Sequence, residues 1–430
     1  MKKKFAQDLL DYIYQSPTAF NAVETSKRLL IENGFEELKM NEKWNIKVSG
    51  KYFLTKNMSA LTAFVVNSDN IQEGFRIIGS HSDSPTFRIK PKSEMDVEDA
   101  YLKLNTEGYG GAILSSWFDR PLAIAGRVVL KSDNILSPKE EIININKPIC
   151  IIPNLAIHMN RSVNDGYKFN KQKDTLPLVG LLNETFEKDN FLLNELTNDL
   201  NIDKGEILDF DLYLYEYEKG CIMGANDEFI SSPRLDNLSM AHASLNALID
   251  SKGEKGINIV SIFDNEEVGS TTKQGADSDM LRNILERICL SLGKDREEFF
   301  AAVYSSFMIS ADLAHALHPN VSEKHDPTNR PIMGRGPVIK ISAEQSYTTD
   351  AFSAGVYKGI CDKCGVNYQE FVNKSDERGG TTIGPISASH LDINSVDVGS
   401  PILSMHSIRE LGSVEDHYNI YKTFVEFYQI

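Results

Sequence analysis

The stretch that decides the fold class of this chain reads INIVSIF, residues 257–263, and is followed directly by DNEEVG, residues 264–269. The first part is an almost continuous apolar run, which is typical of a strand buried on both faces of a sheet. The second part begins with four acidic or amide side chains at the point where that strand ends. In open α/β sheets the chemistry lies at the carboxyl ends of strands. The stretch therefore predicts an α/β fold with an acidic site at the edge of its sheet.

The neighbouring acids Glu266 and Glu267 fit either a solvated acidic loop or a metal site. Burying adjacent like charges is costly unless a cation compensates, and the buried strand before them favours the site. We expect the segment to be extended, so that consecutive side chains point to opposite sides. One glutamate can then bind a metal while its neighbour faces the substrate as a general base.

A second strand-like run, residues 76–79, leads into His81 and Asp83. A two-residue spacing on extended chain puts both side chains on one side. Asp83 can then accept a hydrogen bond from the ring nitrogen that does not bind metal, which fixes the orientation of the imidazole. A purely structural histidine is the alternative interpretation of this motif taken alone.

Three further residues lie at the ends of predicted elements. Asp236 comes just before a predicted helix, where it fits either an N-terminal cap or a carboxylate that bridges two cations. Asp312 follows the apolar run 307–310, and His406 follows a short apolar run. Each residue alone fits a core or cap position. Together with the motifs above, they supply enough histidines and carboxylates to hold two divalent cations and still leave one glutamate to move a proton.

Composition narrows the class of protein. The chain has 430 residues, with 41% hydrophobic and 25% charged residues, which suits two soluble domains. A net charge of -16 argues against a nucleic-acid partner and against polybasic membrane attachment. We see no apolar stretch near the roughly 20 residues of a membrane span, and acids at Asp8 and Asp11 interrupt any signal-like start. The 5 cysteines form no disulfide framework, so we expect a cytoplasmic location.

The chain alternates between two kinds of pattern. An α/β pattern predicts helices at residues 5–15, 16–34, 238–249, 279–292, 350–359 and 414–428, and strands at 51–55, 61–66, 76–79, 257–263 and 338–343. Between these parts, a β-rich pattern predicts strands at 87–89, 128–130, 149–152 and 208–215, and a helix within 181–200. Ser16 is expected to cap the second helix and Gly34 to end it. Residues 208–215 alternate cleanly, with Leu208 on the apolar face.

Six segments together carry more information than any of them alone. They are GSHSDSP (79–85), WFDRPL (117–122), SPRLDN (232–237), FDNEEVGS (263–270), DLAHALHPN (312–320) and MHSIRE (405–410). In this order, and over nearly the whole chain, they resemble the aspartyl-aminopeptidase family of two-metal, zinc-type exopeptidases. The resemblance implies a mixed-sheet, zinc-exopeptidase-like catalytic domain formed by residues 1–86 and 222–430. It also implies that the β-rich insert, residues 87–221, is a dimerisation or assembly domain.

The resemblance further implies a role for each candidate of the metal centre. One divalent cation is bound by His81 and Asp312, and the other by Glu267 and His406. The carboxylate of Asp236 bridges the two cations. Glu266 is then the general base, and Asp83 supports His81. Zinc is the expected metal, with manganese or cobalt as alternatives, because His, Asp and Glu suit all three.

The resemblance also implies a substrate wall formed by His315, Lys340 and Tyr347. Lys340 matches a position that can bind an acidic side chain, and the alternative is a strand lysine that faces solvent. His158 matches a histidine that the family delivers into the site of a neighbouring subunit. This implies a homo-oligomer, expected to be a dodecamer built from dimers.

The function predicted from these residues is a metalloaminopeptidase that removes the N-terminal residue of a peptide through a metal-bridged hydroxide. An acidic N-terminal residue, Asp or Glu, is the expected preference. Three alternatives stay open at this point. They are an aminopeptidase of the same family that prefers neutral or apolar residues, a carboxypeptidase or deacylase on the same scaffold, and a metal-stabilised shell that binds cargo without catalysis.

Overall fold

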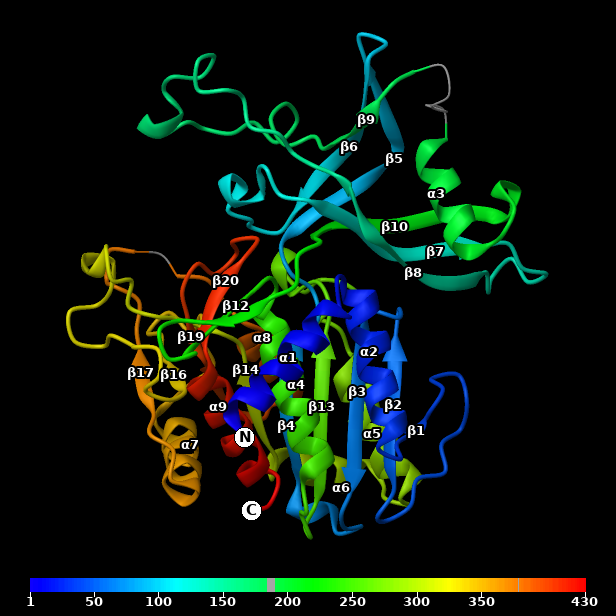
Figure 1. Cartoon of the computed structure of the whole chain (residues 1–430). Coiled ribbons are helices and arrows are strands. Elements are labelled where there is room, and N and C mark those ends of the chain that lie inside the picture. The colour runs from blue at the N-terminus through cyan, green and yellow to red at the C-terminus, as the bar shows by residue number, and fades with distance from the viewer. Residues whose placement is uncertain (184–189, 378) are drawn as a thin grey trace. The chain divides into compact units, whose positions relative to one another are not determined.

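The structure is a computed structural model that describes residues 1–183, 190–377 and 379–430. The chain divides into two compact units (Figure 1). The first unit comprises Met1–Asp83, Gly220–Met405 and Glu410–Ile430, and the second comprises Ser84–Lys219 and His406–Arg409. Among the described residues, no helix is both long and apolar enough to cross a membrane.

The first unit is built on a mixed sheet with a parallel centre. Within the described residues its nine strands lie in the order β1 (Glu36–Glu37), β2 (Lys51–Lys56), β3 (Ala60–Val66), β13 (Ile257–Phe263), β4 (Phe75–His81), β14 (Phe307–Ala311), β18 (Asn394–Gly399), β16 (Val338–Lys340) and β17 (Gln369–Phe371). The central strands β13, β4, β14 and β18 are parallel, whereas β3 and β16 join them antiparallel. Every residue of β13 is buried, as its apolar sequence predicted.

Helices cover both faces of this sheet (Figure 1). One face packs against α1 (Lys2–Tyr14), α2 (Ala19–Glu32), α4 (Leu235–Asp250), α7 (Ala351–Cys364) and α9 (Val414–Phe427). The other face packs against α5 (Met280–Ser291), α6 (Arg296–Tyr304) and α8 (Ile383–Leu391). The predicted α/β fold class is therefore confirmed.

The start of α2 differs from the expectation. Ser16 was the expected cap, but the N-cap is Thr18, whose side chain accepts a hydrogen bond from the Asn21 amide. Thr18 has the extended backbone that an N-cap requires, so the helix begins two residues later than expected. At the other end, Gly34 has φ +80°, a conformation that favours glycine.

Two small sheets complete the first unit. One consists of β11 (Cys221–Met223), β12 (Phe229–Ser232) and β20 (Glu410–Ser413), and the other of β15 (Ala314–His315) and β19 (Pro401–Ile402). Short 3-10 helices lie at Ile71–Glu73 (η1), Glu266–Val268 (η5) and Ser322–Lys324 (η6). The cysteines at 150, 221, 289, 361 and 364 are all free thiols.

The second unit is β-rich. Its sheet, within the described residues, has the order β8 (Lys139–Cys150), β7 (Leu122–Leu130), β10 (Ile207–Glu216), β5 (Thr86–Val97), β6 (Tyr101–Tyr109) and β9 (Leu178–Leu181), and its neighbouring strands are antiparallel. The helix α3 (Phe191–Leu200) and 3-10 turns at Leu114–Trp117 (η2), Val163–Asp165 (η3) and Lys204–Glu206 (η4) accompany the sheet. The role of this unit in assembly stays a prediction.

Two details of the second unit correct the sequence analysis. The helix expected within 181–200 occupies only Phe191–Leu200, since Leu181 ends β9 and residues 184–189 lie outside the described residues. Leu208, expected on the apolar face of its strand, is 54% exposed. The pairing of β10 with β7 shifts register between Ile207 and Asp209, which removes Leu208 from the regular alternation.

Candidate metal centre

The site forms where three parallel strands end. His81 is the last residue of β4 and pairs in register with Phe263, the last residue of β13. Asp312 directly follows β14, the neighbour of β4 on its other side. Because parallel strands end at one edge of a sheet, residues far apart in the sequence come together there.

His81 lies at the centre of this cluster and is 1% exposed. Its Nε2 atom is 3.4 Å from Asp236 Oδ1, 3.8 Å from Asp312 Oδ1 and 4.0 Å from Glu266 Oε2. Ligand atoms of His81, Asp236 and Asp312 all lie within 4.8 Å of one another, and so do those of His81, Glu266 and Glu267. An imidazole and four carboxylates that converge in a largely buried place fit divalent-cation chemistry, since the cations offset the repulsion between the acids.

Asp236 is held by contacts on two sides. Its backbone amide donates a hydrogen bond to Glu410 Oε2 at 2.9 Å. The next residue, Asn237, donates from Nδ2 to the carbonyl oxygen of Ala311 at 2.8 Å, which ties the first turn of α4 to the end of β14. The backbone of Asp236 and Asn237 is not helical, so α4 has a kink at these two residues and its regular part begins after them. Sequence reasoning assigned no role to Glu410, because nothing along the chain links it to Asp236.

Asp83 connects the histidine to the glutamate turn. Its two carboxylate oxygens accept hydrogen bonds from the backbone amides of Glu266 and Glu267, each at 3.1 Å. Asp83 Oδ1 is also 3.3 Å from His81 Nδ1. The His81-Ser82-Asp83 motif predicted the contact with His81, but no sequence pattern indicated the contact with the turn, which spans 183 positions of sequence.

The conformation of the glutamate turn corrects another expectation. Residues 264–267 are not extended, because Asn265 has φ +62° and Glu266–Val268 form the 3-10 helix η5. The Glu266 and Glu267 amides at the start of this turn need an acceptor outside the helix, and Asp83 provides it. The two glutamates still reach the cluster, but they do so from a tight turn.

Three buried ionisable groups of the site have pKa values that differ from their ordinary values. Burial raises the pKa of Glu266 to about 8; the charge of His81 opposes this shift, and Asp312, Glu267 and Asp236 add to it. Burial and then Asp83 raise the pKa of Asp264 to about 7. Burial opposes protonation of His81, but its hydrogen bonds to Asp236, Asp312 and Asp83 raise its pKa well above the ordinary value. Cations bound among these acids would favour their ionised forms.

The predicted substrate wall lies beside the cluster. Lys340 is 2% exposed, donates from Nζ to the Leu313 carbonyl at 3.1 Å, and lies 3.5 Å from Asp312 Oδ2. Its ammonium is 5.2 Å from the ring centre of Tyr347. Burial lowers the pKa of Lys340, but Asp312 and Asp397 outweigh that effect and raise it, so the side chain stays charged. The alternative of a strand lysine that faces solvent is therefore wrong.

Comparison with known proteins decides the family. Residues 12–428 match the family described as "Aminopeptidase I zinc metalloprotease (M18)". The chain belongs to the M18 family. It is 60% identical over 430 residues to a probable M18 family aminopeptidase 2 of Clostridium novyi, covering 100% of this chain and 99% of that protein. The resemblance to aspartyl aminopeptidases is thereby confirmed, because that family is M18.

Solved M18 structures share the fold over the whole chain. A chain in the cryo-EM structure of the Ape4 and Nbr1 complex is 37% identical with a TM-score of 0.96, covering 100% of this chain and 86% of that one. A chain of the S. cerevisiae mApe1 dodecamer is 27% identical with a TM-score of 0.84, covering 98% of this chain and 95% of that one. This M18 protein is a metal-dependent aminopeptidase of the zinc metalloprotease class. The alternative of a shell without catalysis is excluded.

Two predicted site residues lie in the second unit. His406 belongs to the segment His406–Arg409, and its Nδ1 atom is 3.3 Å from the Gly111 carbonyl oxygen of the same unit. Its role as a metal ligand of this M18 protein stays a prediction. His158 lies in an exposed turn between three exposed apolar residues, Leu155, Ile157 and Met159, whose exposures are 54%, 47% and 69%.

Proposed function

We propose that this M18 aminopeptidase holds two divalent cations, with zinc the first candidate and manganese or cobalt the alternatives. Five proposed residues would bind them: His81 and Asp312 on one ion, Glu267 and His406 on the other, and Asp236 between the two. The observation that carries the proposal is the convergence of His81, Asp236, Asp312, Glu266 and Glu267 at one edge of the sheet. When bound, the cations would supply Lewis-acid chemistry, which lowers the pKa of a water molecule and polarises the scissile carbonyl.

Glu266 is the proposed general base. It would accept the proton of the attacking water at its carboxylate and donate it to the amine that leaves. Its carboxylate lies at the cluster without belonging to either proposed ligand pair. Asp83 fixes the backbone of Glu266 and Glu267 and contacts His81, so it would position both the base and a ligand.

The restriction to the first peptide bond follows from the charge of the site. The carboxylates of the cluster favour a free, positively charged α-amino group and have no partner for an acylated one. A carboxypeptidase or deacylase would instead use a cation, such as Lys340, to bind the carboxylate of its substrate, and it would accept an acylated amino group. We therefore expect an N-acetylated peptide to resist cleavage.

An acidic N-terminal residue is the proposed substrate. Lys340 is buried and charged beside the cluster, and Tyr347 lies against it. An acidic side chain of a substrate can pair with this ammonium, which already forms an ion pair with Asp312.

The test compares Asp-, Glu- and Leu-p-nitroanilides with the metal-loaded enzyme, and each with its N-acetylated form. We expect the acidic substrates to have the higher kcat/KM and the acetylated forms to be inert. A preference for Leu would contradict the acidic specificity, and cleavage of acetylated substrates would contradict the aminopeptidase assignment.

We also propose that the protein forms homo-oligomers, with His158 reaching the site of a neighbouring subunit. The exposed apolar residues around His158 suit such a contact. The S. cerevisiae mApe1 structure is a dodecamer, which makes a dodecamer the first candidate for this protein. A cytoplasmic location, expected from the cysteines, belongs to the same proposal.

A further inference from the structure

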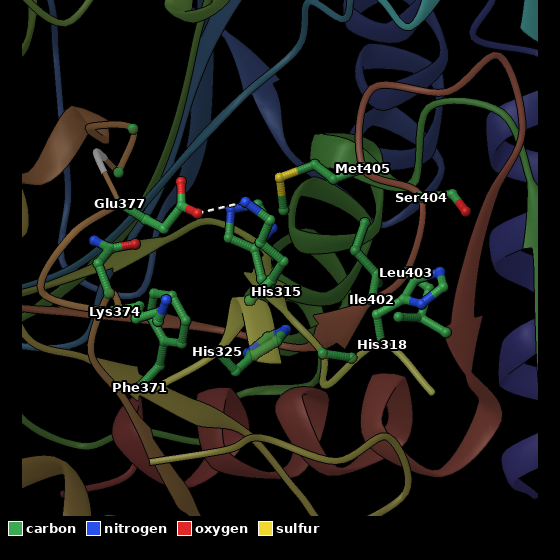
Figure 2. Close-up of a pocket in the computed structure, with 15 residues that line it drawn as sticks. His315, His318, His325, Phe371, Lys374, Glu377, Ile402, Leu403, Ser404 and Met405 are labelled. Atoms are coloured by element: carbon green, nitrogen blue, oxygen red, sulfur yellow. Dashed lines mark hydrogen bonds and ion pairs between the residues drawn. The ribbon is translucent and has the colours of Figure 1, made fainter. Parts of the chain in front are cut away.

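A cavity of about 330 Å³ is lined by His315, by Phe371 and by the segment Ile402 to Met405 (Figure 2). Two of its walls are the paired short strands β15 and β19, which bring His315 and Ile402 together. His315 is three residues after the proposed ligand Asp312. The cavity lies wholly within the first unit and is large enough for a side chain, since ligand sites begin at about 300 Å³.

Phe371 separates this cavity from the Lys340 wall. Its ring centre is 6.0 Å from that of His315 and 6.5 Å from that of His325, both of which line the cavity. The ring of Tyr347, which contacts Lys340, is 6.4 Å from the same phenylalanine. Phe371 therefore borders both the cavity and the predicted substrate wall.

A bound peptide would present two side chains to these two places. When its first peptide bond lies at the cluster, the side chains of its first and second residues belong to opposite sides of that bond. On an extended chain they also point in opposite directions. If the Lys340 wall receives the first side chain, the cavity is left for the second.

The charges around the cavity favour a negative ligand. Its charged lining residues within the described chain are Lys324, Lys374 and Glu377, a net charge of one positive. Glu377 pairs with Lys324 at 2.5 Å, the contact drawn as a dashed line in Figure 2. Lys374 pairs at 3.0 Å with Asp376, whose side chain is 71% exposed. Exposed ion pairs contribute little, so a substrate carboxylate can replace Asp376 at small cost.

Two histidines add hydrogen-bonding capacity without adding charge. Burial lowers the pKa of His315, and the charge of Lys340 lowers it further. Burial also lowers the pKa of His325. Both rings are therefore neutral near pH 7, and each carries one N–H donor and one acceptor. The His325 ring already uses one of them in a hydrogen bond with the Ala316 backbone.

We propose that this cavity, which we call the second-residue pocket, binds a carboxylate carried by the second residue of the substrate, with Lys374 as its main partner. The inference depends on the proposed function, since it requires an aminopeptidase that cleaves after the first residue. The carboxylate is either an acidic side chain or, in a dipeptide, the C-terminus.

The test measures KM of the metal-loaded enzyme for matched peptides with the same first residue. One pair has Asp or Asn as its second residue, followed by an amidated glycine, and the other pair is a dipeptide and its amide. We expect the carboxylate member of at least one pair to have a KM about fivefold lower, as for one partly exposed charged contact. The pair that shows the difference identifies the source of the carboxylate.

Variants assign the effect to the pocket. Lys374→Met is expected to bring the KM ratio near one, whereas Lys374→Arg keeps the charge and is expected to keep the ratio. Lys363→Met is the matched control, because Lys363 is an exposed lysine of α7 that pairs with Glu426 away from the pocket. Comparing two peptides within each variant cancels any general loss of activity.

Two results would overturn the proposal: equal KM values within both pairs for the unmodified enzyme, or a ratio that persists in Lys374→Met. Aminoacyl p-nitroanilides have no second residue and serve as the reference. If they are cleaved while the peptide pairs show no difference, the pocket assignment fails and the proposed function stands. If neither the anilides nor the peptides are cleaved, the proposed function itself fails.

Discussion

Gly399 shows how closely the backbone is packed around one proposed ligand. A methyl group at this position, the last residue of β18, would overlap the carbonyl oxygen of Asp312. The Asp312 amide also donates to the Val398 carbonyl at 3.0 Å, so the two segments cannot separate without breaking this bond. The position of Asp312 therefore depends on the absence of a side chain at residue 399.

The substitution Gly399→Ala is expected to displace Asp312. We expect a loss of about 1–3 kcal/mol in the free energy of unfolding, as for an overpacked core. Because a small displacement in an active site is costly, kcat/KM should fall by roughly tenfold to a hundredfold. Urea unfolding and p-nitroanilide kinetics measure the two effects.

Gly355→Ala is the matched control for this prediction. Gly355 lies within α7, and no described heavy atom outside its own helix and chain neighbours lies within 4 Å of the position of the added methyl group. Alanine should stabilise this helix by about 0.5–1 kcal/mol and leave kinetics unchanged. Equal behaviour of the two variants would contradict the argument from close packing.

For single residues, the sequence predicted which side chains come together at the site. It did not predict all the hydrogen bonds that hold them there. His81, Glu267 and Asp312 follow or end apolar strands, and strand ends of a parallel sheet converge by geometry. The hydrogen bonds from the glutamate turn to Asp83 could not be predicted, because they depend on how a turn fits a loop distant in sequence. The same holds for the contact between Asp236 and Glu410.

Among the elements, the packing of α1 against α4 and α9 encloses two histidines. His242 of α4 and His417 of α9 are 3% exposed, and their ring nitrogens lie 3.1 Å apart. The ring of Phe5 in α1 is tilted against His242, with a centre distance of 4.8 Å, and stacked on His417, with a centre distance of 4.9 Å. Burial lowers the pKa of His242 to about 3, and burial followed by His242 lowers that of His417 well below its ordinary value.

This packing predicts that acid destabilises the first unit. The ordinary histidine pKa is about 6.5, so below that pH the unfolded chain binds protons that the folded chain does not. The contribution of these histidines to the free energy of unfolding should therefore be fully present above about pH 7 and decrease as the pH falls towards 3. Between pH 7 and pH 5 the decrease should be about 2 kcal/mol per histidine. Urea unfolding at several pH values measures this slope.

The variant His242→Gln isolates the histidine contribution, because glutamine does not titrate. We expect its unfolding free energy to be lower at pH 7, where a buried contact is lost, and to change less between pH 7 and pH 5. His390→Gln is the control, since His390 is partly exposed on α8 and pairs with Asp277 at 2.8 Å. An unchanged slope in His242→Gln would refute the assignment.

Element positions followed from the sequence wherever one face or both faces are buried. The range 257–263 was predicted residue for residue, because a wholly buried strand has a continuous apolar sequence. The helices predicted at 279–292 and 414–428 were found with ends that differ by one residue, whereas the one predicted at 350–359 continues to Cys364. Failures came where long-range contacts decide: the turn at residues 264–267 and the register shift at Leu208.

For the whole molecule, the central open prediction is that active sites need a second chain. His158 lies in the exposed turn of the second unit, and the proposed role requires it to act on a neighbouring subunit. If this is so, a defect in His158 and a defect in Glu266 affect different chains of one shared site. Two inactive variants can then complement each other.

Mixed oligomers of His158→Ala and Glu266→Gln provide the measurement. We expect each variant alone to have low activity, and chains reassembled together to be several-fold more active than either. In the mixture, an intact Glu266 can meet an intact His158 from another chain. A mixture no better than its components, with size-exclusion chromatography showing that mixed oligomers formed, would show that His158 does not act between subunits.

The metal centre itself is tested most directly by Glu266→Gln, with bound metal and turnover measured on the same preparation. We expect two ions per chain by elemental analysis in both the unmodified enzyme and the variant. We also expect kcat to be lowered by about 10²–10⁴-fold in the variant, because the ligands remain while the proton carrier is lost. A variant that keeps its metals and turns over near the unmodified rate would contradict the role of Glu266.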